Sequence, residues 1–593
     1  MTDGARRWYP LPSSVPTARG ATSKATRAAK KTGPIDPLAG PKLALAGRVV
    51  TMDDAWTVKP DAVLFIEQGT IVAVQDRRQP PPPGFDTVPV VETGGTLFPG
   101  LIELHNHLSY NALPLWSPVP KLFQHRGQWP DHPDYRKLIS GPMTVVGTYR
   151  DAQGKAALLA PLVRYVECKC LLGGVTTTQG IMLSSNAGVQ RYYRGIVRNV
   201  EQTDDPALSE AKARIPDVDA KSAASFLARL KKEDSCFLLH LSEGITKPGQ
   251  PDSIARKHFR ALEVAPNQWA INDRFAGIHA AGLLPEDLAV LAQHGGAIVW
   301  SPLSNLLLYG DTARVDVAKQ AGVRISLGSD WSPSGSKNLF GELKVAWLYS
   351  QHQLNGLFSA REIVAMATRE AAKILKWHDA LGTLEAEKRA DVLVIAGQED
   401  DPYDALIQAK ETAISLVMIN GVARYGLPGL MTALGSEGET VRVGRQTRRL
   451  FLQQETGDPD VGSVSLRAAR SALKKAFQDL PKLARELEKP KPKPKKAVGR
   501  ALDAPEPVVW SLALDEIQAT GMDQRPRLPF NGPRDFTGPK RASTRAASVP
   551  LSQLLQPIML DPLTVADDGN FLTDIANQPN LPESIRTGLA DLY

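Results

Sequence analysis

Two histidines two positions apart are the first feature of the sequence that could do chemistry. His105 and His107 follow the largely apolar run Leu101-Ile102-Glu103-Leu104, which begins after the break at Pro99-Gly100. On a β-strand, residues i and i+2 point to the same side, so both imidazoles would face one point at the strand's end. Imidazole nitrogen is a common ligand of zinc and related divalent metals. The two residues are therefore half of a candidate metal site, although a His-x-His pair alone is as often an ordinary buried pair.

Three further apolar runs end in potential ligands. His240 ends the run that starts at residue 237, with Glu243 three residues on, His279 ends the run 275–279, and Asp330 follows the run 323–329. Taken singly, each is more simply explained as a hydrogen-bonded histidine or a capping aspartate. In a barrel of parallel strands, however, the carboxyl ends of the strands converge on one face, where active sites are built. The four strand ends together therefore predict a convergent cluster.

These residues also carry a resemblance to a known family. From about residue 43 to residue 425 the sequence resembles the amidohydrolase superfamily, in particular its cytosine deaminase-like, adenosyl-homocysteine deaminase-like and triazine deaminase-like hydrolases. The segments that carry the resemblance are 99–107, the His240-x-x-Glu243 pair, His279, and the segments 301–305, 328–330 and 381–395. One departure is Glu387, which stands where the family generally has glycine in a turn away from the chemistry.

The resemblance implies a role for each of these side chains. His105, His107, His240 and Asp330 are expected to bind one divalent metal ion, zinc or iron, and to leave room for a water. Such a metal lowers the pKa of its water, and Asp330 is expected to accept the proton. Glu243 would be the general acid/base that protonates the leaving nitrogen, and His279 would polarise the substrate or stabilise the developing oxyanion.

The sequence favours one metal ion over two. Binuclear members of the superfamily bridge their metals through a lysine, usually carboxylated, or a glutamate on an intermediate strand. The corresponding strand here is expected over residues 173–180, which offer hydroxyls and the Gln179 amide. Neither group is suited to bridging two metals.

We expect an α/β fold: a (β/α)8 TIM-type barrel, a small β-sandwich formed by the segments that flank the barrel, and a C-terminal extension. Residues 68–70 predict a hairpin turn, and Ser359 with Glu362 predicts a capped helix over 359–375. The expected ranges are a disordered basic tail at 1–40, the first segment of the β-sandwich at 41–96, the barrel at 97–382, the second segment of the β-sandwich at 383–445, a helical extension at 446–488, a Lys/Pro linker at 489–500 and a region of unknown role at 501–593.

The segment 108–143 shows little helical or strand pattern. Long loops in compact domains are usually functional, and this one would leave the first strand at the catalytic face. It is a candidate lid or substrate wall, and equally a structural loop on the barrel rim. His125 and Arg126 within it could bind an acidic or carbonyl group of the substrate.

Composition narrows the class of protein. The chain has 593 residues, of which 42% are hydrophobic, and three cysteines, so we expect a large core and no disulfide framework. Thiol usage favours the cytoplasm, and the absence of any run of eighteen apolar residues argues against a membrane span. The net charge of +7 comes from residues 1–40 and 489–500, which are more simply solvated tails than a nucleic-acid surface.

The leading hypothesis is hydrolysis of a non-peptide C–N bond in a small nitrogen-containing ring, by deamination or by opening of a cyclic amide. One alternative is displacement of another leaving group, such as halide from a triazine-like ring; because chloride needs no proton, Glu243 argues weakly against it. A further alternative is a non-catalytic barrel that serves as a scaffold. The substrate's identity, zinc against iron, and a homo-oligomeric state are left open.

Overall fold

The computed structural model describes residues 40–186, 190–203, 205–247, 249–398, 401–454, 458–489, 509–514 and 549–593. Nearly all of the predicted tail 1–40 and linker 489–500, and some of the region 501–593, lie outside the described residues. Within the described ranges, no helix has both the length and the apolar character that a membrane crossing requires.

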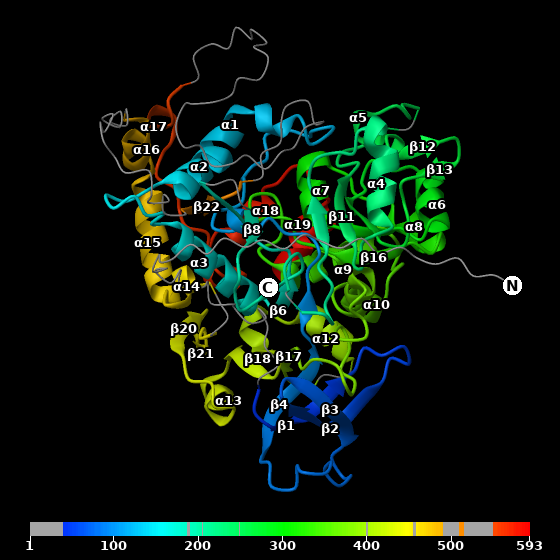
Figure 1. Ribbon diagram of the computed structural model, residues 1–593, viewed down its shortest axis with the longest axis vertical. Coiled ribbons are helices and arrows are strands. Elements are labelled where there is room, and N and C mark those ends of the chain that lie inside the picture. The colour runs from blue at the N-terminus through cyan, green and yellow to red at the C-terminus, as the bar shows by residue number, and fades with distance from the viewer. Residues whose placement is uncertain are drawn as a thin grey trace, which may run out of the picture.

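One nine-stranded sheet joins segments from the two sides of the predicted barrel (Figure 1). β4 pairs antiparallel with β17, with Phe98 opposite Leu393, so the chain returns to the sheet after more than 290 residues. The predicted hairpin at residues 68–70 is confirmed, with Glu67 opposite Thr70. The strands of the nine-stranded sheet are β1 (Leu43–Val50), β2 (Val58–Glu67), β3 (Thr70–Asp76), β4 (Val90–Pro99), β17 (Val392–Ala396), β18 (Ile414–Ile419), β19 (Val422–Gly426), β20 (Glu439–Val443) and β21 (Gln446–Leu450). The sheet is continuous, and β21 extends it into the range predicted to be helical.

Two parallel sheets hold the strand ends that the sequence singled out. The first contains β5 (Leu101–Ile102), β6 (Val175–Thr178) and β9 (Arg198–Asn199). The second contains β10 (Lys212–Arg214), β11 (Phe237–Leu241), β14 (Phe275–His279), β15 (Ala297–Trp300) and β16 (Arg324–Leu327). The Ala211 N–H donates to the Val200 carbonyl at 2.8 Å, and Asn106 forms a parallel bridge with Asp330, so the sheets are linked at both ends.

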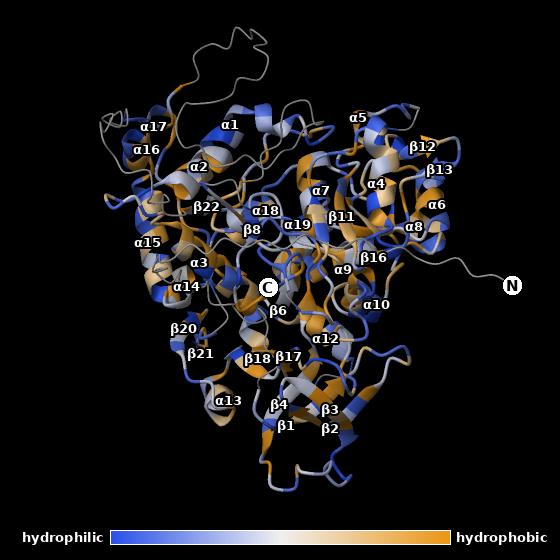
Figure 2. Ribbon diagram, in the orientation of Figure 1, coloured by the Kyte–Doolittle hydropathy of each residue, from blue (hydrophilic) through white to orange (hydrophobic). Residues whose placement is uncertain are grey.

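In the described part of the chain, helices follow six of the eight parallel strands. They are α3 (Leu159–Leu172), α4 (Ala223–Leu230), α5 (Ile254–Arg260), α6 (Pro285–Gln293), α7 (Pro302–Tyr309), α8 (Val315–Gln320), α9 (Leu339–Gln353), α10 (Ala360–Met366) and α11 (Arg369–Leu375). Figure 2 shows hydrophobic residues along inner strands such as β11 and hydrophilic residues on peripheral helices such as α1. In the second sheet, β11, β14, β15 and β16 are almost entirely buried, as expected for parallel strands covered on both faces, whereas β10 is half-buried.

The helix predicted over 359–375 is present as two helices. The Glu362 carboxylate accepts the backbone N–H of Ser359 at 2.9 Å, so the predicted capping box is confirmed. The helix is interrupted at Thr368, whose backbone leaves helical geometry before α11 begins. The prediction of one continuous helix was therefore wrong.

The segment 108–143 carries more regular structure than its sequence suggests. It contains the helical turns η1 (Leu108–Tyr110), η2 (Trp129–Asp131) and η3 (Arg136–Ser140), with α1 (Pro133–Tyr135) and the start of α2 (Gly141–Thr148). Its aromatic residues are buried against one another and against Trp331, with the Trp129 and Trp331 ring centroids 5.4 Å apart. Packing rather than helical periodicity therefore orders this segment.

The C-terminal segments return to the body of the molecule. α15 (Leu466–Gln478) packs on α3, α19 (Glu583–Asp591) packs on α9, and β22 (Trp510–Leu512) pairs with β7 (Met182–Ser185). The remaining elements are β8 (Gln190–Tyr192), η4 (Ala220–Ser222), β12 (Glu263–Ala265), β13 (Gln268–Trp269), α12 (Pro402–Gln408), η5 (Glu411–Ala413), α13 (Pro428–Ala433), α14 (Pro459–Gly462), α16 (Leu480–Glu488), α17 (Leu551–Leu554), η6 (Val565–Asp567) and α18 (Phe571–Ala576).

Candidate metal centre and active site

The structure brings together all of the strand-end residues that the sequence singled out. His105 and His107 follow β5, His240 lies in β11, His279 ends β14, and Asp330 follows β16. His279 and Asp330 have positive φ angles of 68° and 66°, which non-glycine residues rarely adopt. Such backbone strain concentrates at functional sites, where the surrounding packing holds it in place.

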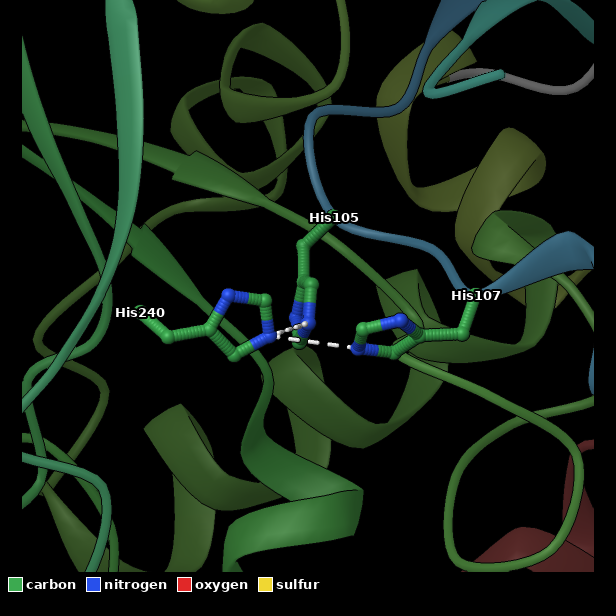
Figure 3. Close-up of side chains that lie close together, drawn as sticks. All are labelled: His105, His107 and His240. Atoms are coloured by element: carbon green, nitrogen blue, oxygen red, sulfur yellow. Dashed lines mark hydrogen bonds between the residues drawn. The ribbon is translucent and has the colours of Figure 1, made fainter. Parts of the chain in front are cut away.

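The donor atoms of four of these residues face one another. The Nε2 atom of His240 lies 3.2 Å from Nε2 of His105 and 3.1 Å from Nε2 of His107 (Figure 3). Oδ1 of Asp330 lies 3.5 Å from the same nitrogens of His105 and His107. A tetrahedral zinc site with ligand distances of about 2.0–2.1 Å has ligand-to-ligand edges of about 3.3–3.4 Å. These four distances are close to such edges, and the ligand atoms of His105, His107 and His240 all lie within 4.8 Å of one another.

The electrostatics of the cluster favour ligands over protonated side chains. Burial, with the neighbouring histidines, holds the pKa of both His105 and His240 well below the ordinary value, so both imidazoles stay neutral. Burial raises the pKa of Asp330, against the opposing influence of His107 and His279. Metal ligation requires neutral imidazole, and a cation would offset the cost of burying the Asp330 carboxylate.

Separate partners orient these side chains. Nδ1 of His105 hydrogen-bonds to Oγ of Ser301 at 2.7 Å, and the Ser304 hydroxyl donates to Oδ2 of Asp330 at 2.6 Å. Partners of this kind fix ring orientation and leave the opposite atom to face the metal. The sequence pointed to residues 301–305 only through the family resemblance, and neither serine had a predicted role.

Glu243 and His279 lie at the edge of the cluster. Oε2 of Glu243 is 3.6 Å from Nε2 of His279, and both side chains are buried. Nδ1 of His279 hydrogen-bonds to Oδ1 of Asn305 at 2.9 Å, and the Asn305 amide donates to Thr312. Because the Asn305 amide nitrogen donates to Thr312, its oxygen faces His279, so Nδ1 of His279 carries a proton and donates it to that oxygen. Nε2 of His279 can then donate to a ligand only when the ring is doubly protonated. His279 also lies within ligand range of His105 and Asp330.

Arg126 does not have the surroundings of a substrate-binding residue. Its guanidinium is completely buried and forms an ion pair with Asp217, and its backbone N–H donates to the Glu243 carbonyl at 3.2 Å. His125 forms a β-bridge with Gly244. The suggestion that Arg126 binds the substrate was therefore wrong, because the charge is already paired inside the protein.

Two adjoining cavities open beside the cluster. The smaller, of about 20 Å³, is lined by His107, Tyr110, Trp129, Ile215, His240, Glu243, His279, Asp330 and Trp331. The larger, of about 280 Å³, shares His107, Ile215 and His240 with it and adds polar groups that include Gln179 and Glu201. The aromatic walls of the smaller cavity come from segment 108–143 and from the residue after Asp330. The sequence singled out segment 108–143 as a candidate wall, and Tyr110 and Trp129 of that segment line this cavity, but it gave no signal for Trp331.

The sequence matches the amidohydrolase family over residues 96–424, more than half of the chain. A 5-methylthioadenosine/S-adenosylhomocysteine deaminase of Teredinibacter turnerae is 35% identical over 121 residues, which cover 20% of this chain and 27% of that protein. An S-triazine hydrolase of Gordonia rubripertincta is 28% identical over 192 residues, 30% of this chain and 40% of that protein. The chain thus spans less than half of the length of these two relatives.

One solved structure is also similar to this chain. A zinc-bound adenosine deaminase of Xanthomonas campestris has 18% sequence identity and a TM-score of 0.47, covering 65% of this chain and 93% of that one. The resemblance stated from the sequence is confirmed by the family match, and all five strand-end residues fall inside the matched range. The protein belongs to the amidohydrolase family.

Proposed function

We propose that the protein is a metal-dependent hydrolase that cleaves a non-peptide C–N bond of a small nitrogen-containing ring, by deamination or by opening of a cyclic amide. The observation that carries the proposal is the convergence of three imidazole nitrogens and one carboxylate oxygen at 3.1–3.5 Å, beside the carboxylate of Glu243. Membership of the amidohydrolase family supports the reaction class.

We also infer that the two parallel sheets form a (β/α)8 barrel. They contribute eight strands, and hydrogen bonds join them at both ends, between Val200 and Ala211 and between Leu104 and Leu327. The proposed ligands then lie where strands end on one face of a barrel, the usual place for an active site. The proposed domain boundaries, a cytoplasmic location and a homo-oligomeric state stay predictions.

The proposed metal ligands are His105, His107, His240 and Asp330. Three nitrogens and one carboxylate suit one zinc ion, and iron is the second choice because it accepts the same ligands. When bound, such a metal supplies a Lewis acid that makes hydroxide available from water near neutral pH. A single ion is supported by the strand ending at Thr178, which brings no lysine or glutamate to the cluster.

The protein's own groups would move the protons. Asp330 would accept a proton from the attacking water, and Glu243 would deliver a proton to the leaving nitrogen. Doubly protonated His279 would donate from Nε2 to the oxygen that gains negative charge. The adjoining cavity of about 280 Å³ has room for a ring, and Tyr110, Trp129 and Trp331 bring flat aromatic faces to the cluster, against which a flat heterocycle could pack.

Halide displacement from a triazine-like ring is the second candidate. It is favoured by the similarity to an S-triazine hydrolase, over 40% of the length of that protein. Chloride leaves without a proton, whereas ammonia or an amine needs one. The buried carboxylate of Glu243 beside the cluster therefore favours C–N cleavage.

The test combines metal analysis with a screen for released ammonia and chloride. The purified protein, loaded with zinc or iron, is presented with purines, pyrimidines, pterins, triazines and cyclic ureas. About one bound metal per chain and ammonia release from one ring class are expected. Chloride release without ammonia would establish the second candidate, and a protein that refused zinc, iron and manganese would instead be a scaffold.

A further inference from the structure

Tyr309 is the buried hydroxyl group in direct contact with the proposed general acid. The last residue of α7, it donates its O–H to Oε1 of Glu243 at 2.7 Å. Only 2% of Tyr309 and 3% of Glu243 is exposed, so this hydrogen bond is shielded from water. Burial, together with the neighbouring Glu243 carboxylate, raises the pKa of Tyr309 well above the ordinary tyrosine value. The hydroxyl therefore keeps its proton and remains a donor.

The direction of this hydrogen bond is fixed from its other side. Nε1 of Trp129 donates to the Tyr309 oxygen at 3.1 Å. An indole N–H can only donate, so it occupies a lone pair of the tyrosine oxygen and leaves the hydroxyl proton for Glu243. Chains of buried hydrogen bonds polarise one another, so the Trp129 contact strengthens the contact with Glu243.

The chain of hydrogen bonds leaves one carboxylate oxygen available to the site. Oε1 of Glu243 is held by Tyr309, and Oε2 lies on the side of His279. The backbone of Glu243 is held by the same long segment that carries Trp129, since its carbonyl accepts the N–H of Arg126. Gly244, with a φ of 140°, allows this close approach, because a Cβ there would lie 2.3 Å from the Gln124 carbonyl oxygen.

We propose that Tyr309 is a positioning residue for Glu243. Through Trp129, this positioning also depends on how segment 108–143 packs against the site. The proposal rests on the proposed role of Glu243 and deepens it. Trp129 also lines the small cavity beside the cluster, so a ligand group that enters this cavity contacts the residue that donates to Tyr309. The segment then acts on catalysis through one defined hydrogen-bond chain and not only as a wall.

The first test needs neither metal nor substrate. The indole N–H signals of the full-length protein are recorded by 15N NMR, and the Trp129 signal is assigned by its loss in Trp129→Phe. In Tyr309→Phe, the Trp129 N–H loses its acceptor, and we expect its exchange with deuterium to accelerate by roughly tenfold or more. Glu243→Gln keeps the hydrogen bonds from Trp129 to Tyr309 and from Tyr309 to residue 243 but removes the negative charge at residue 243, so we expect the Trp129 signal to shift.

Tyr165→Phe is the matched control, because the Tyr165 hydroxyl is also buried and donates to the Asp561 carbonyl at 2.6 Å. This variant leaves the Trp129 signal in place. A Trp129 signal that does not respond to Glu243→Gln would overturn the proposal. Should Tyr309→Phe fail to fold, the Glu243→Gln spectrum decides alone.

The second test uses the ring compound that releases ammonia in the screen. Tyr309→Phe should lower kcat by roughly 10- to 100-fold with KM changed by less than about threefold, the scale of a hydrogen bond to a charged group. In a Glu243→Gln background, Tyr309→Phe should change kcat no further, because its partner is already gone. Equal losses in both backgrounds would mean a merely structural role. If no ring compound reacts, the proposed function fails, while the NMR result still decides the hydrogen-bond chain.

Discussion

Glu243 is the residue whose chemistry distinguishes a C–N hydrolase from a site that only binds a metal. It is buried, it faces His279 through Oε2, and it is absent from the set of donors spaced to share one ion. A carboxyl group in this place can carry a proton to a leaving nitrogen without giving up a metal ligand. Proton delivery and metal binding are therefore separable by substitution.

Glu243→Gln tests that separation. We expect kcat for ammonia release to fall by about 10²-fold or more, because the amide cannot transfer a proton, while bound metal stays near one equivalent per chain. Steady-state kinetics and metal analysis of the same samples measure both. Glu286→Gln, with a side chain that is 59% exposed on α6, is the control. Wild-type turnover in Glu243→Gln would remove this residue from the mechanism.

His240→Ala tests the other half of the site. Nε2 of His240 lies within 3.2 Å of the nearest nitrogens of two other proposed ligands, so its loss opens one corner of the ligand set. We expect bound zinc to drop from about one equivalent to a small fraction after dialysis, with the fold retained by circular dichroism. The exposed His352 on α9 provides the control, His352→Ala, which should keep its metal. Full zinc occupancy in His240→Ala would exclude His240 from the ligands.

At the scale of elements, the short helix α7 and the residue before it orient four side chains of the site. Ser301 contacts His105, Ser304 contacts Asp330, Asn305 contacts His279 and Tyr309 contacts Glu243. Positions 301, 305 and 309 are four apart, the spacing that places residues on one face of a helix. The four residues contacted in this way are spread over more than 220 residues of sequence, yet all four contact residues 301–309.

The strand-end residues could be predicted from the sequence, whereas the α7 residues that contact them could not. The ends of buried apolar strands are visible as His240, His279 and Asp330, because a strand's burial and its end are local properties. The Ser359 capping box is local too. The face that α7 presents, and the break at Thr368 that divides the helix predicted over 359–375, depend on distant packing. For the same reason Arg126 was misassigned: its partner Asp217 is 91 residues away.

Another group beneath segment 108–143 gives a pH-dependent prediction. His258 on α5 lies 3.2 Å from the Asp217 carboxylate, and burial, with Arg126 and His125 nearby, lowers the pKa of His258 from 6.5 to about 3. Between these pH values the unfolded chain binds a proton that the folded protein does not. Stability therefore rises with pH across this window and is lost on acidification below 6.5.

His258→Asn removes that contribution. Going down from about pH 6.5, we expect the free energy of unfolding of the wild type to fall more steeply than that of the variant, by up to about 1.4 kcal/mol per pH unit. Burial raises the pKa of Asp217 to about 6, but this group is present in both proteins. Urea denaturation at a series of pH values gives the two slopes. Parallel slopes would contradict the assignment of a neutral buried His258.

At the scale of the whole molecule, the C-terminal segment 549–593 belongs to the body that carries the site. Asp561 forms ion pairs with Lys169 of α3 and with Lys337, which follows the Asp330 loop, and all three side chains are only 2% exposed. Lys169 also donates to Ser332, two residues after Asp330. The Gln578 amide donates to the Trp116 carbonyl and its oxygen accepts the Val119 N–H. The segment thus braces both loops that wall the small cavity.

Asp561→Asn tests how strongly the molecule depends on this brace. Burial lowers the pKa of Lys169 to about 8, although the neighbouring Asp561 carboxylate acts in the opposite direction. Burial also acts to lower the pKa of Lys337, but Asp561 and Asp568 outweigh it, so that pKa is raised. Removing the carboxylate leaves Lys169 without its carboxylate partner, and breaking a buried ion pair in this way costs about 3–5 kcal/mol. We expect the free energy of unfolding in urea to fall by that amount, with unfolding still cooperative. Asp591→Asn, on the exposed end of α19, should change it by less than about 0.5 kcal/mol. If Asp561→Asn matched that control, the C-terminal segment would be a passive cover, and the loops that wall the cavity would hold their places without it.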